Sequence, residues 1–575
     1  MGLTNRPACR SFAVVFLLAA ANIFFMAGLV ALVPPFEGFD ETAHFSRIKS
    51  QAFAAQADPA SHRIDASVVD YYRKGPMPYG WIAYDTLHTH DPSRGYMTYR
   101  EFFAKPEQQK SYAENYWQVP LAPGYSASPE ANWQYQHPVV YYSVMAPMLK
   151  WLTGHASFLT VLLALRMLSA TFALAGLGIG LGATYRYQRE KDADEAKAVL
   201  ALSALYPFLI PEFFWEFARL TNDSLCFLFF GIIWAFLLRY LRKPDGDAWI
   251  GLGFFMGLGW LTKAYMVPVS GGILAFLLFH RLRRAAPGTR LRLSVWTAPV
   301  RVVLLMLMTA APFYLASLMS AGYVGSGELG AALHQKDVGT LLRNAVTWPE
   351  FGLGVSEILY SFWMTTNWSD IIIGFPLFLT GAVMIVGAIM AFDYARISFR
   401  KGADPLLQLP FWILVPLIAG LLMHVVIVTI LTYGQGVQAS TPGYYLHVFA
   451  PALAFAVAVS LRDFHRKKWL RPLVWAALLG APLGLYVTAT YAAVFAGCAV
   501  PQPIAAYGWM GIDVRDLYSL PPDGLFQCAG QFSQAVRNLS VIAWPNLACA
   551  LIGIALVALV ASAVLYLAPR GKQTA

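Results

Sequence analysis

The sequence predicts an all-α polytopic membrane protein of about 12 transmembrane helices, with a small mixed extracytoplasmic loop domain after the first helix. Of the 575 residues, 57% are hydrophobic and only 13% are charged, and the mean hydropathy is +0.51. Soluble domains carry about 25% charged residues. The composition therefore excludes a soluble globular protein.

Although the formal net charge is +10, the basic residues are distributed as topology signals. Cytoplasmic loops of membrane proteins are enriched in Lys and Arg. Of the 42 Lys and Arg residues, 25 lie in alternate segments: the N-terminus, 185–197, 239–248, 281–301, 395–401, 462–471 and the C-terminus. We therefore expect a multi-pass protein of the bacterial inner (plasma) membrane with both termini cytoplasmic. Membrane lipid, and no nucleic acid, is its expected partner.

The apolar runs, taken in order, divide the chain into seven parts. We expect the third span as one helix over 198–215 and the eleventh over 472–495. The full division is 1–33 (N-terminus and first span), 34–155 (extracytoplasmic loop domain with juxtamembrane helices), 156–320 (spans two to seven), 321–370 (extracytoplasmic loop), 371–495 (spans eight to eleven), 496–540 (extracytoplasmic loop) and 541–575 (last span and C-terminal tail).

The outside segments differ in character. Residues 34–136 are rich in Tyr and Trp and are punctuated by Pro and Gly, which indicates a small ordered domain because disordered segments carry few aromatics. Residues 138–152 are amphipathic and are expected to lie in the membrane interface. Cys498 and Cys528 share the last outside loop. A disulfide and two free thiols are both compatible with that placement.

The most informative stretch, PPFEGFDETAHFSRIK, directly follows the first span and places four ionisable groups beside the membrane: Glu37, Asp40, Glu41 and His44. The two prolines end the span, and a new helix begins near Asp40. Asp40 and His44 then lie on one face of that helix. A carboxylate held there is suited to deprotonating an acceptor hydroxyl. The alternative is that Asp40 only caps the helix through the N–H of Thr42 or Ala43.

Further charged residues gather at the outer ends of the predicted spans: Glu212, Glu216, Arg219, Asp223 and Lys263. Arg219 and Lys263 are basic residues on the predicted outer side, so they are exceptions to the positive-inside rule. Together with the neighbouring acidic residues they indicate a site for a negatively charged, lipid-attached substrate. Lys263 would neutralise a phosphate; its alternative role is snorkelling to the interface. Asp223 has the alternative of capping the fourth span with Arg219 as its partner.

Several motifs together resemble one family. They are the Asp40-Glu41 pair, an H-P-x-x-Y-Y segment beginning at His137, the dipeptide Asn222-Asp223 and G-L-x-x-L-T-K ending at Lys263. In this order they resemble the GT-C glycosyltransferase superfamily, the group of protein O-mannosyltransferases and lipid A aminoarabinose transferases. The resemblance covers mainly 11–280, with a weaker match at 441–461.

The resemblance implies a membrane glycosyltransferase with a polyprenyl-phosphate sugar as donor and inverting transfer to an acceptor hydroxyl outside the cytoplasm. Residues 156–320 would form the catalytic core. Asp40 matches the acceptor-activating aspartate, Glu41 its neighbour, Lys263 the lysine at the donor phosphate, and Asp223 an acidic residue of the cavity. The sequence leaves open whether the acceptor is a lipid, glycan or protein, and whether a divalent metal (Mg or Mn) is needed. The remaining substrate-binding candidates are Glu37, His44, His137, Arg219, Asn222, Tyr444, Tyr445 and His447.

One departure from the family concerns the start of a late span. Where relatives often read G-R-Y-x-x-P, this chain reads Gly443-Tyr444-Tyr445-Leu446-His447, without the arginine. Arg219 and His447 are the candidate replacements. If neither compensates, a third interpretation, a non-catalytic scaffold that keeps the fold, gains support.

A transporter or flippase for a lipid-linked saccharide is the alternative function. Twelve spans suit it as well. Transporters, however, usually place ionisable residues near the bilayer midplane and show internal symmetry between halves. In this sequence the charges lie at outer span ends, and the segment 34–136 has no counterpart in the second half.

Overall fold

The computed structural model describes most of the chain. The predicted eleventh span, Cys498, Cys528 and much of the two late outside loops lie outside the described residues. The described ranges are 7–55, 59–78, 80–82, 95–210, 212–244, 246–285, 293–321, 346–363, 377–432, 441–465, 494–496 and 530–567, with Gly339 and Trp368.

The predicted all-α membrane fold is confirmed. By length and composition, eight candidate spans are found among the described residues. They lie in α1 (Pro7–Leu32), α8 (Phe158–Arg189), α12 (Asp223–Arg242), α14 (Met266–Arg284), α15 (Leu293–Ala321), α21 (Pro405–Thr432), α22 (Ala450–His465) with the preceding η6 (Gly443–Phe449), and α28 (Pro545–Leu567). The shorter helix α13 (Ala248–Trp260) falls where the fifth span was predicted, at 249–262, and α20 (Leu377–Ser398) falls where the eighth was predicted, at 371–393.

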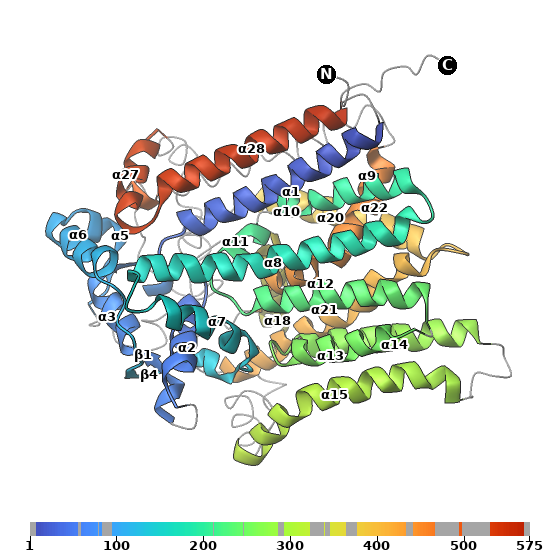
Figure 1. Ribbon diagram of the computed structural model, residues 1–575, viewed down its shortest axis with the longest axis horizontal. Helices are drawn as coiled ribbons and strands as arrows, with labels where there is room; N and C mark the ends of the chain where they lie inside the picture. Colours follow the sequence, from blue (N-terminus) through green and yellow to red (C-terminus); the bar gives the residue numbers. More distant parts are fainter. Residues whose placement is uncertain are drawn as a thin grey trace.

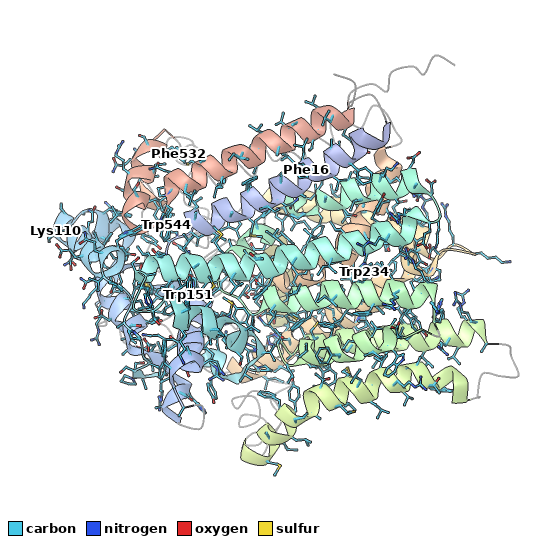
Figure 2. All side chains as sticks on the ribbon, in the orientation of Figure 1. Phe16, Lys110, Trp151, Trp234, Phe532 and Trp544 are labelled. Carbon is cyan, nitrogen blue, oxygen red and sulfur yellow. The ribbon has the colours of Figure 1, made fainter. Side chains whose placement is uncertain are left out.

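The long helices run side by side (Figure 1). Helix α1 packs along α28, and α8 along α12. The start of α1 and the end of α28 lie at one end of the bundle, and α2 and α3 lie toward the other. Apolar side chains cover the outer faces, as a lipid environment requires: Phe16 on α1 is 73% exposed, whereas Trp234 between helices is fully buried (Figure 2).

The third predicted span is wrong as a single helix. The chain forms three short helices instead, α9 (Ala193–Ala204), α10 (Tyr206–Leu209) and α11 (Glu212–Ala218). Pro207 stands in the first turn of α10, and a proline inside a continuous helix would lack a hydrogen bond and clash with the preceding turn. Every residue of α11 is buried. Broken backbone among membrane helices is tolerated where protein surrounds it.

The segment after α1 forms the predicted small mixed domain. Strand β1 pairs antiparallel with β4 (Arg63 opposite Ala131), and β2 pairs parallel with β3. Its elements are α2 (Glu41–Phe53), η1 (Pro59–His62), β1 (Arg63–Asp65), α3 (Ala66–Lys74), β2 (Pro76–Met77), β3 (Met97–Thr98), α5 (Tyr99–Phe103), α6 (Pro106–Tyr112), η3 (Ala113–Gln118), β4 (Ala127–Ala131), η4 (Trp133–Gln136) and α7 (Val140–Leu152).

Aromatic side chains form the core of this domain and join it to the bundle. Tyr71 packs against Phe36, Tyr116 and Phe158. Its hydroxyl lies 3.1 Å from that of Tyr112. Such ring contacts contribute beyond area burial, so the domain is fixed onto the start of α8.

In the described parts of the segments that the sequence predicted only as outside loops, the structure has two helices. They are α18 (Trp348–Trp363) and α27 (Phe532–Ile542). Helix α18 packs against η6. Gly443 permits this approach, because a Cβ there would come within 1.8 Å of the Ile358 carbonyl oxygen. The start of η6, where the family arginine is missing, is thereby held against the bundle.

Candidate active site

Asp40 lies at the entry to α2 in an unusual backbone conformation. It has φ 60° and ψ 4°, the left-handed region, and Phe36 has φ 63°. Few residues other than glycine adopt this region, and such residues cluster at functional sites. The Asp40 side chain makes no capping hydrogen bond. The alternative in which it caps α2 through Thr42 or Ala43 is therefore wrong.

The Asp40 carboxylate is held by an aromatic side chain instead. The indole N–H of Trp133 in η4 donates to Asp40 Oδ1 over 2.7 Å. The start of η4 is held against α2, because the side-chain amide of Asn132 donates to the Ala43 carbonyl over 3.0 Å. Within the described residues, Asp40 Oδ2 accepts no hydrogen bond, and the residue is half-buried. One oxygen is fixed and the other is open, as a general base requires.

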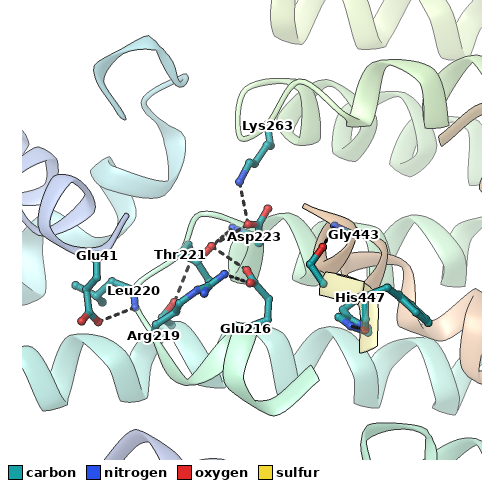
Figure 3. Close-up of polar contacts among 12 residues, drawn as sticks. Glu41, Glu216, Arg219, Leu220, Thr221, Asp223, Lys263, Gly443 and His447 are labelled. Carbon is teal, nitrogen blue, oxygen red and sulfur yellow. Dashed lines mark hydrogen bonds and ion pairs between the residues drawn. The ribbon is translucent and has the colours of Figure 1, made fainter. Parts of the chain in front are cut away.

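Glu41, the next residue, is in the opposite situation. It is fully buried, and its two oxygens accept four hydrogen bonds. Phe36 N donates over 2.9 Å and Leu220 N over 3.1 Å, the latter visible in Figure 3. Arg166 on α8 donates the other two, from Nε over 2.7 Å and from Nη2. Glu41 thus joins three segments, and this geometry favours a structural role over a catalytic one.

Asp223 and Lys263 form a buried ion pair, shown in Figure 3. Lys263 Nζ donates to Asp223 Oδ2 over 2.8 Å, and the same oxygen accepts from Thr221 Oγ1 over 2.9 Å. The Tyr265 hydroxyl donates to Oδ1. Lys263 is only 7% exposed. The structure contradicts both sequence alternatives, since Lys263 points inward rather than snorkelling and Asp223 pairs with it rather than with Arg219.

Arg219 pairs with Glu216 on α11. Its Nε and Nη1 atoms have no hydrogen-bond partner among the described residues. The guanidinium lies 4.9 Å from the ring centroid of Phe39 and 4.7 Å from that of Tyr444. Gly38 allows this close approach, since a Cβ there would lie 2.5 Å from Arg219 Cβ. Arg219 is thus a buried cation with unfilled donors.

The two cations Arg219 and Lys263 lie over the rings of two adjacent tyrosines at the start of η6. Arg219 lies over Tyr444, and Lys263 Nζ lies 4.4 Å from the ring centroid of Tyr445. Cation–π contacts of this kind hold a cation without consuming its hydrogen-bond donors. An arginine from α11's C-terminal side therefore lies over the position where the family arginine is absent.

Tyr142 connects the two parts of the site. Its hydroxyl lies 3.0 Å from His44 Nδ1 on α2. Burial raises the pKa of Tyr142, and the carboxylates of Asp40 and Asp223 both add to that increase. Both carboxylates therefore lie within electrostatic range of this one phenol.

One part of the chain is similar to a known protein family. Residues 146–315 match the family of dolichyl-phosphate-mannose-protein mannosyltransferases. The matched segment contains Glu216, Arg219, Asp223 and Lys263 but not Asp40. Over this segment the chain is therefore similar to a family of the GT-C superfamily of membrane glycosyltransferases.

Two solved structures of ArnT from Cupriavidus metallidurans are also similar to this chain. The one bound to undecaprenyl phosphate is 16% identical, with a TM-score of 0.36, over 81% of this chain and 72% of that chain. The apo form is 18% identical, with a TM-score of 0.37, over 79% and 72%. No curated protein matches this chain.

The remaining predicted residues of the glycosyltransferase site are buried or partly buried. Burial and the Lys263 charge lower the pKa of His137 to about 3. Asn222 makes a long contact of 3.4 Å from Nδ2 to the Thr262 carbonyl, next to Lys263. Glu37 is fully buried, and its backbone carbonyl accepts from Trp368 N over 3.1 Å.

His447 does not take the place of the missing arginine. Its Nδ1 lies 3.0 Å from the Tyr206 hydroxyl and its Nε2 lies 2.9 Å from the Phe362 carbonyl. These partners are satisfied when Nε2–H donates to the carbonyl and Nδ1 accepts from the hydroxyl. Both ring nitrogens are therefore used to hold η6 in place. Arg219 is the remaining candidate for the role of the missing arginine.

Sequence reasoning missed two partners that decide how the glycosyltransferase site is built, Arg166 and Trp133. Arg166 could have been found from the sequence, because it is a charged residue within the apolar span 156–184. A charge in such a span destabilises the protein unless it is paired, so it predicts a buried partner. Trp133 could not have been found in this way, because it is one of many aromatic residues in 34–136 and no local sequence feature relates it to Asp40. Within the described residues, no group of three His, Cys, Asp or Glu side chains is arranged as a metal site.

His44 makes the stability of the enzyme depend on pH. Burial, and then the Lys263 charge, lower its pKa well below the usual 6.5. The unfolded chain therefore binds a proton below about pH 6.5 that the folded chain does not, so the free energy of unfolding falls by about 1.4 kcal/mol per pH unit there. Thermal unfolding between pH 7.5 and 5 measures this effect. His44→Gln is expected to reduce the acid dependence, and an unchanged dependence would contradict the assignment.

Proposed function

We propose that this glycosyltransferase moves a sugar from a polyprenyl-phosphate donor to a hydroxyl of a lipid, glycan or protein acceptor on the extracytoplasmic face, with inversion at the anomeric carbon. The observation that carries the proposal is the pair of buried cations, Lys263 and Arg219, seated on the adjacent rings of Tyr445 and Tyr444. Two neighbouring cations with donors left unfilled suit a phosphate.

The donor phosphate is assigned to this pair of cations. An ammonium has three N–H donors, and one from Lys263 goes to Asp223. Arg219 Nη2 goes to Glu216, while Nε and Nη1 are unfilled among the described residues. The carboxylate partners keep both cations charged and oriented without a ligand, as preorganised electrostatic stabilisation requires.

The acceptor is assigned to the side of Asp40. As the acceptor oxygen attacks the anomeric carbon, Asp40 Oδ2 takes the proton from the hydroxyl. The bond between the anomeric carbon and the phosphate oxygen breaks, and that oxygen keeps the electron pair. The departing polyprenyl phosphate gains a negative charge, which Lys263 and Arg219 stabilise. Attack opposite the leaving group inverts the configuration.

Replacement of Lys263 by Gln is expected to weaken binding of undecaprenyl phosphate by roughly tenfold or more, because a hydrogen bond to a charged group contributes about 1.5–3 kcal/mol. The amide still donates to Asp223 but carries no charge. Binding is measured on the purified full chain in phosphatidylcholine nanodiscs, with thermal unfolding of the same samples.

The chain provides a matched control in Lys49→Gln. Lys49 also pairs with a buried carboxylate over 2.8 Å, that of Asp65 in the outside domain. Both substitutions remove one buried cation from an ion pair, so both lower stability. Only Lys263→Gln is expected to lose affinity for the lipid phosphate. Equal affinities in the two variants would contradict the proposed donor site.

A further inference from the structure

Arg47 on α2 is a buried cation that has no counter-ion among the residues the structure describes. Five Lys and Arg side chains in the described residues are buried, and four of them pair with a carboxylate: Lys49, Arg166, Arg219 and Lys263. Arg47 is 2% exposed and makes no ion pair with any described residue. Its Nε and Nη1 have no hydrogen-bond partner there. A buried unpaired charge destabilises a protein unless another group neutralises it.

Aromatic rings hold the Arg47 guanidinium in place. It lies 3.7 Å from the ring centroid of Tyr135 and 5.7 Å from that of Tyr142. Burial lowers the pKa of Arg47. Ring faces orient a guanidinium while leaving its in-plane N–H groups available. This environment suits an incoming anion with a phosphate or carboxylate group, which an arginine binds well.

The position of Arg47 relates it to the acceptor side of the proposed site. His44 and Arg47 are three residues apart and therefore lie on one face of α2, where both contact Tyr142. The same short segment η4 supplies Trp133, which holds Asp40, and Tyr135, which stacks on Arg47. Arg47 lies seven positions after Asp40, the residue that precedes α2, which corresponds to about 10 Å of helical rise.

We propose that Arg47 binds an anionic group of the acceptor. The acceptor would carry a phosphate or carboxylate roughly 10 Å from the hydroxyl that receives the sugar, on the scale of the helical rise. Trp133 and Tyr135 would line the path between the two groups. This inference rests on the proposed function for the role of Asp40, but the anion site itself does not depend on it.

Binding of inorganic phosphate tests the proposal on the purified full chain in phosphatidylcholine nanodiscs. The wild-type protein is expected to bind two phosphates by calorimetry, one at Arg47 and one at Lys263 and Arg219. Arg47→Gln removes the first, with at least about a tenfold loss of affinity at that site. Arg47→Lys keeps the charge and retains weakened binding. Equal phosphate binding by wild type and Arg47→Gln would overturn the proposal.

The variants separate this inference from the proposed function. Lys263→Gln with Arg219→Gln removes only the second phosphate, and retention of both phosphates in that double variant contradicts the donor site while leaving Arg47 unaffected. Without phosphate, Arg47→Gln is expected to unfold at the same or a higher temperature, because an uncompensated charge is removed. If this variant does not fold, selective loss of the Arg47 phosphate in Tyr135→Leu decides the question, and normal binding there overturns the proposal.

A further comparison distinguishes two sources of the anion. Adding phosphatidylglycerol to the nanodiscs is expected to leave the Arg47-dependent phosphate binding unchanged, because the nearly complete burial of Arg47 favours a group that enters the site with the acceptor. Competition by phosphatidylglycerol would assign the site to a lipid headgroup and overturn its assignment to the acceptor.

Discussion

Asp40→Asn is expected to leave the protein folded and to lower sugar transfer by about 10²–10⁴-fold, the usual contribution of a general base. An amide cannot take the acceptor proton. The fold should persist, because Asn tolerates the left-handed backbone that Asp40 adopts and its Oδ1 still accepts from Trp133. The measurement is transfer from a polyprenyl-phosphate sugar in proteoliposomes, with thermal unfolding of the same preparation.

Binding of undecaprenyl phosphate serves as the control for Asp40→Asn, since the donor phosphate is assigned to Lys263 and Arg219. It is expected to stay at the wild-type level. Near-normal transfer by a well-folded Asp40→Asn protein would remove Asp40 as the base. Glu41 would not be the obvious substitute, because its oxygens already accept four hydrogen bonds.

Glu41→Ala is expected to have the opposite effect and to destabilise the protein by about 3–5 kcal/mol, the usual result of removing one partner of a buried ion pair. It leaves Arg166 charged and buried inside a membrane helix, together with unfilled donors at Phe36 N and Leu220 N. The measurement is the yield of folded protein and its thermal unfolding temperature.

A double variant gives the control. Glu41→Ala with Arg166→Met removes both charges, and replacing a buried pair by apolar side chains is often close to neutral. The double variant is therefore expected to recover much of the lost stability. If Glu41→Ala folds as well as the wild type but loses transfer, the structural role assigned to Glu41 is wrong and Glu41 becomes a candidate base.

The broken third span shows where local patterns lose their predictive value. Hydropathy summed over about 20 residues locates a span, and this is why α1, α8, α12 and α21 lie where the sequence placed them. The same sum does not register Pro207, which marks one of the breaks between α9, α10 and α11. The break matters for the site, because it buries Glu216 of α11 beside Arg219.

Apolar length and charge position are local properties, so the membrane fold and the placement of Asp40, Asp223 and Lys263 at span ends could be predicted from the sequence. Which charges meet depends on how distant segments pack. The tertiary structure placed Arg166 on Glu41, Lys263 on Asp223 and Arg219 over Tyr444. Two adjacent carboxylates, Asp40 and Glu41, look equivalent in sequence. They differ because a side chain's chemistry depends on the donors and charges that distant segments bring to it.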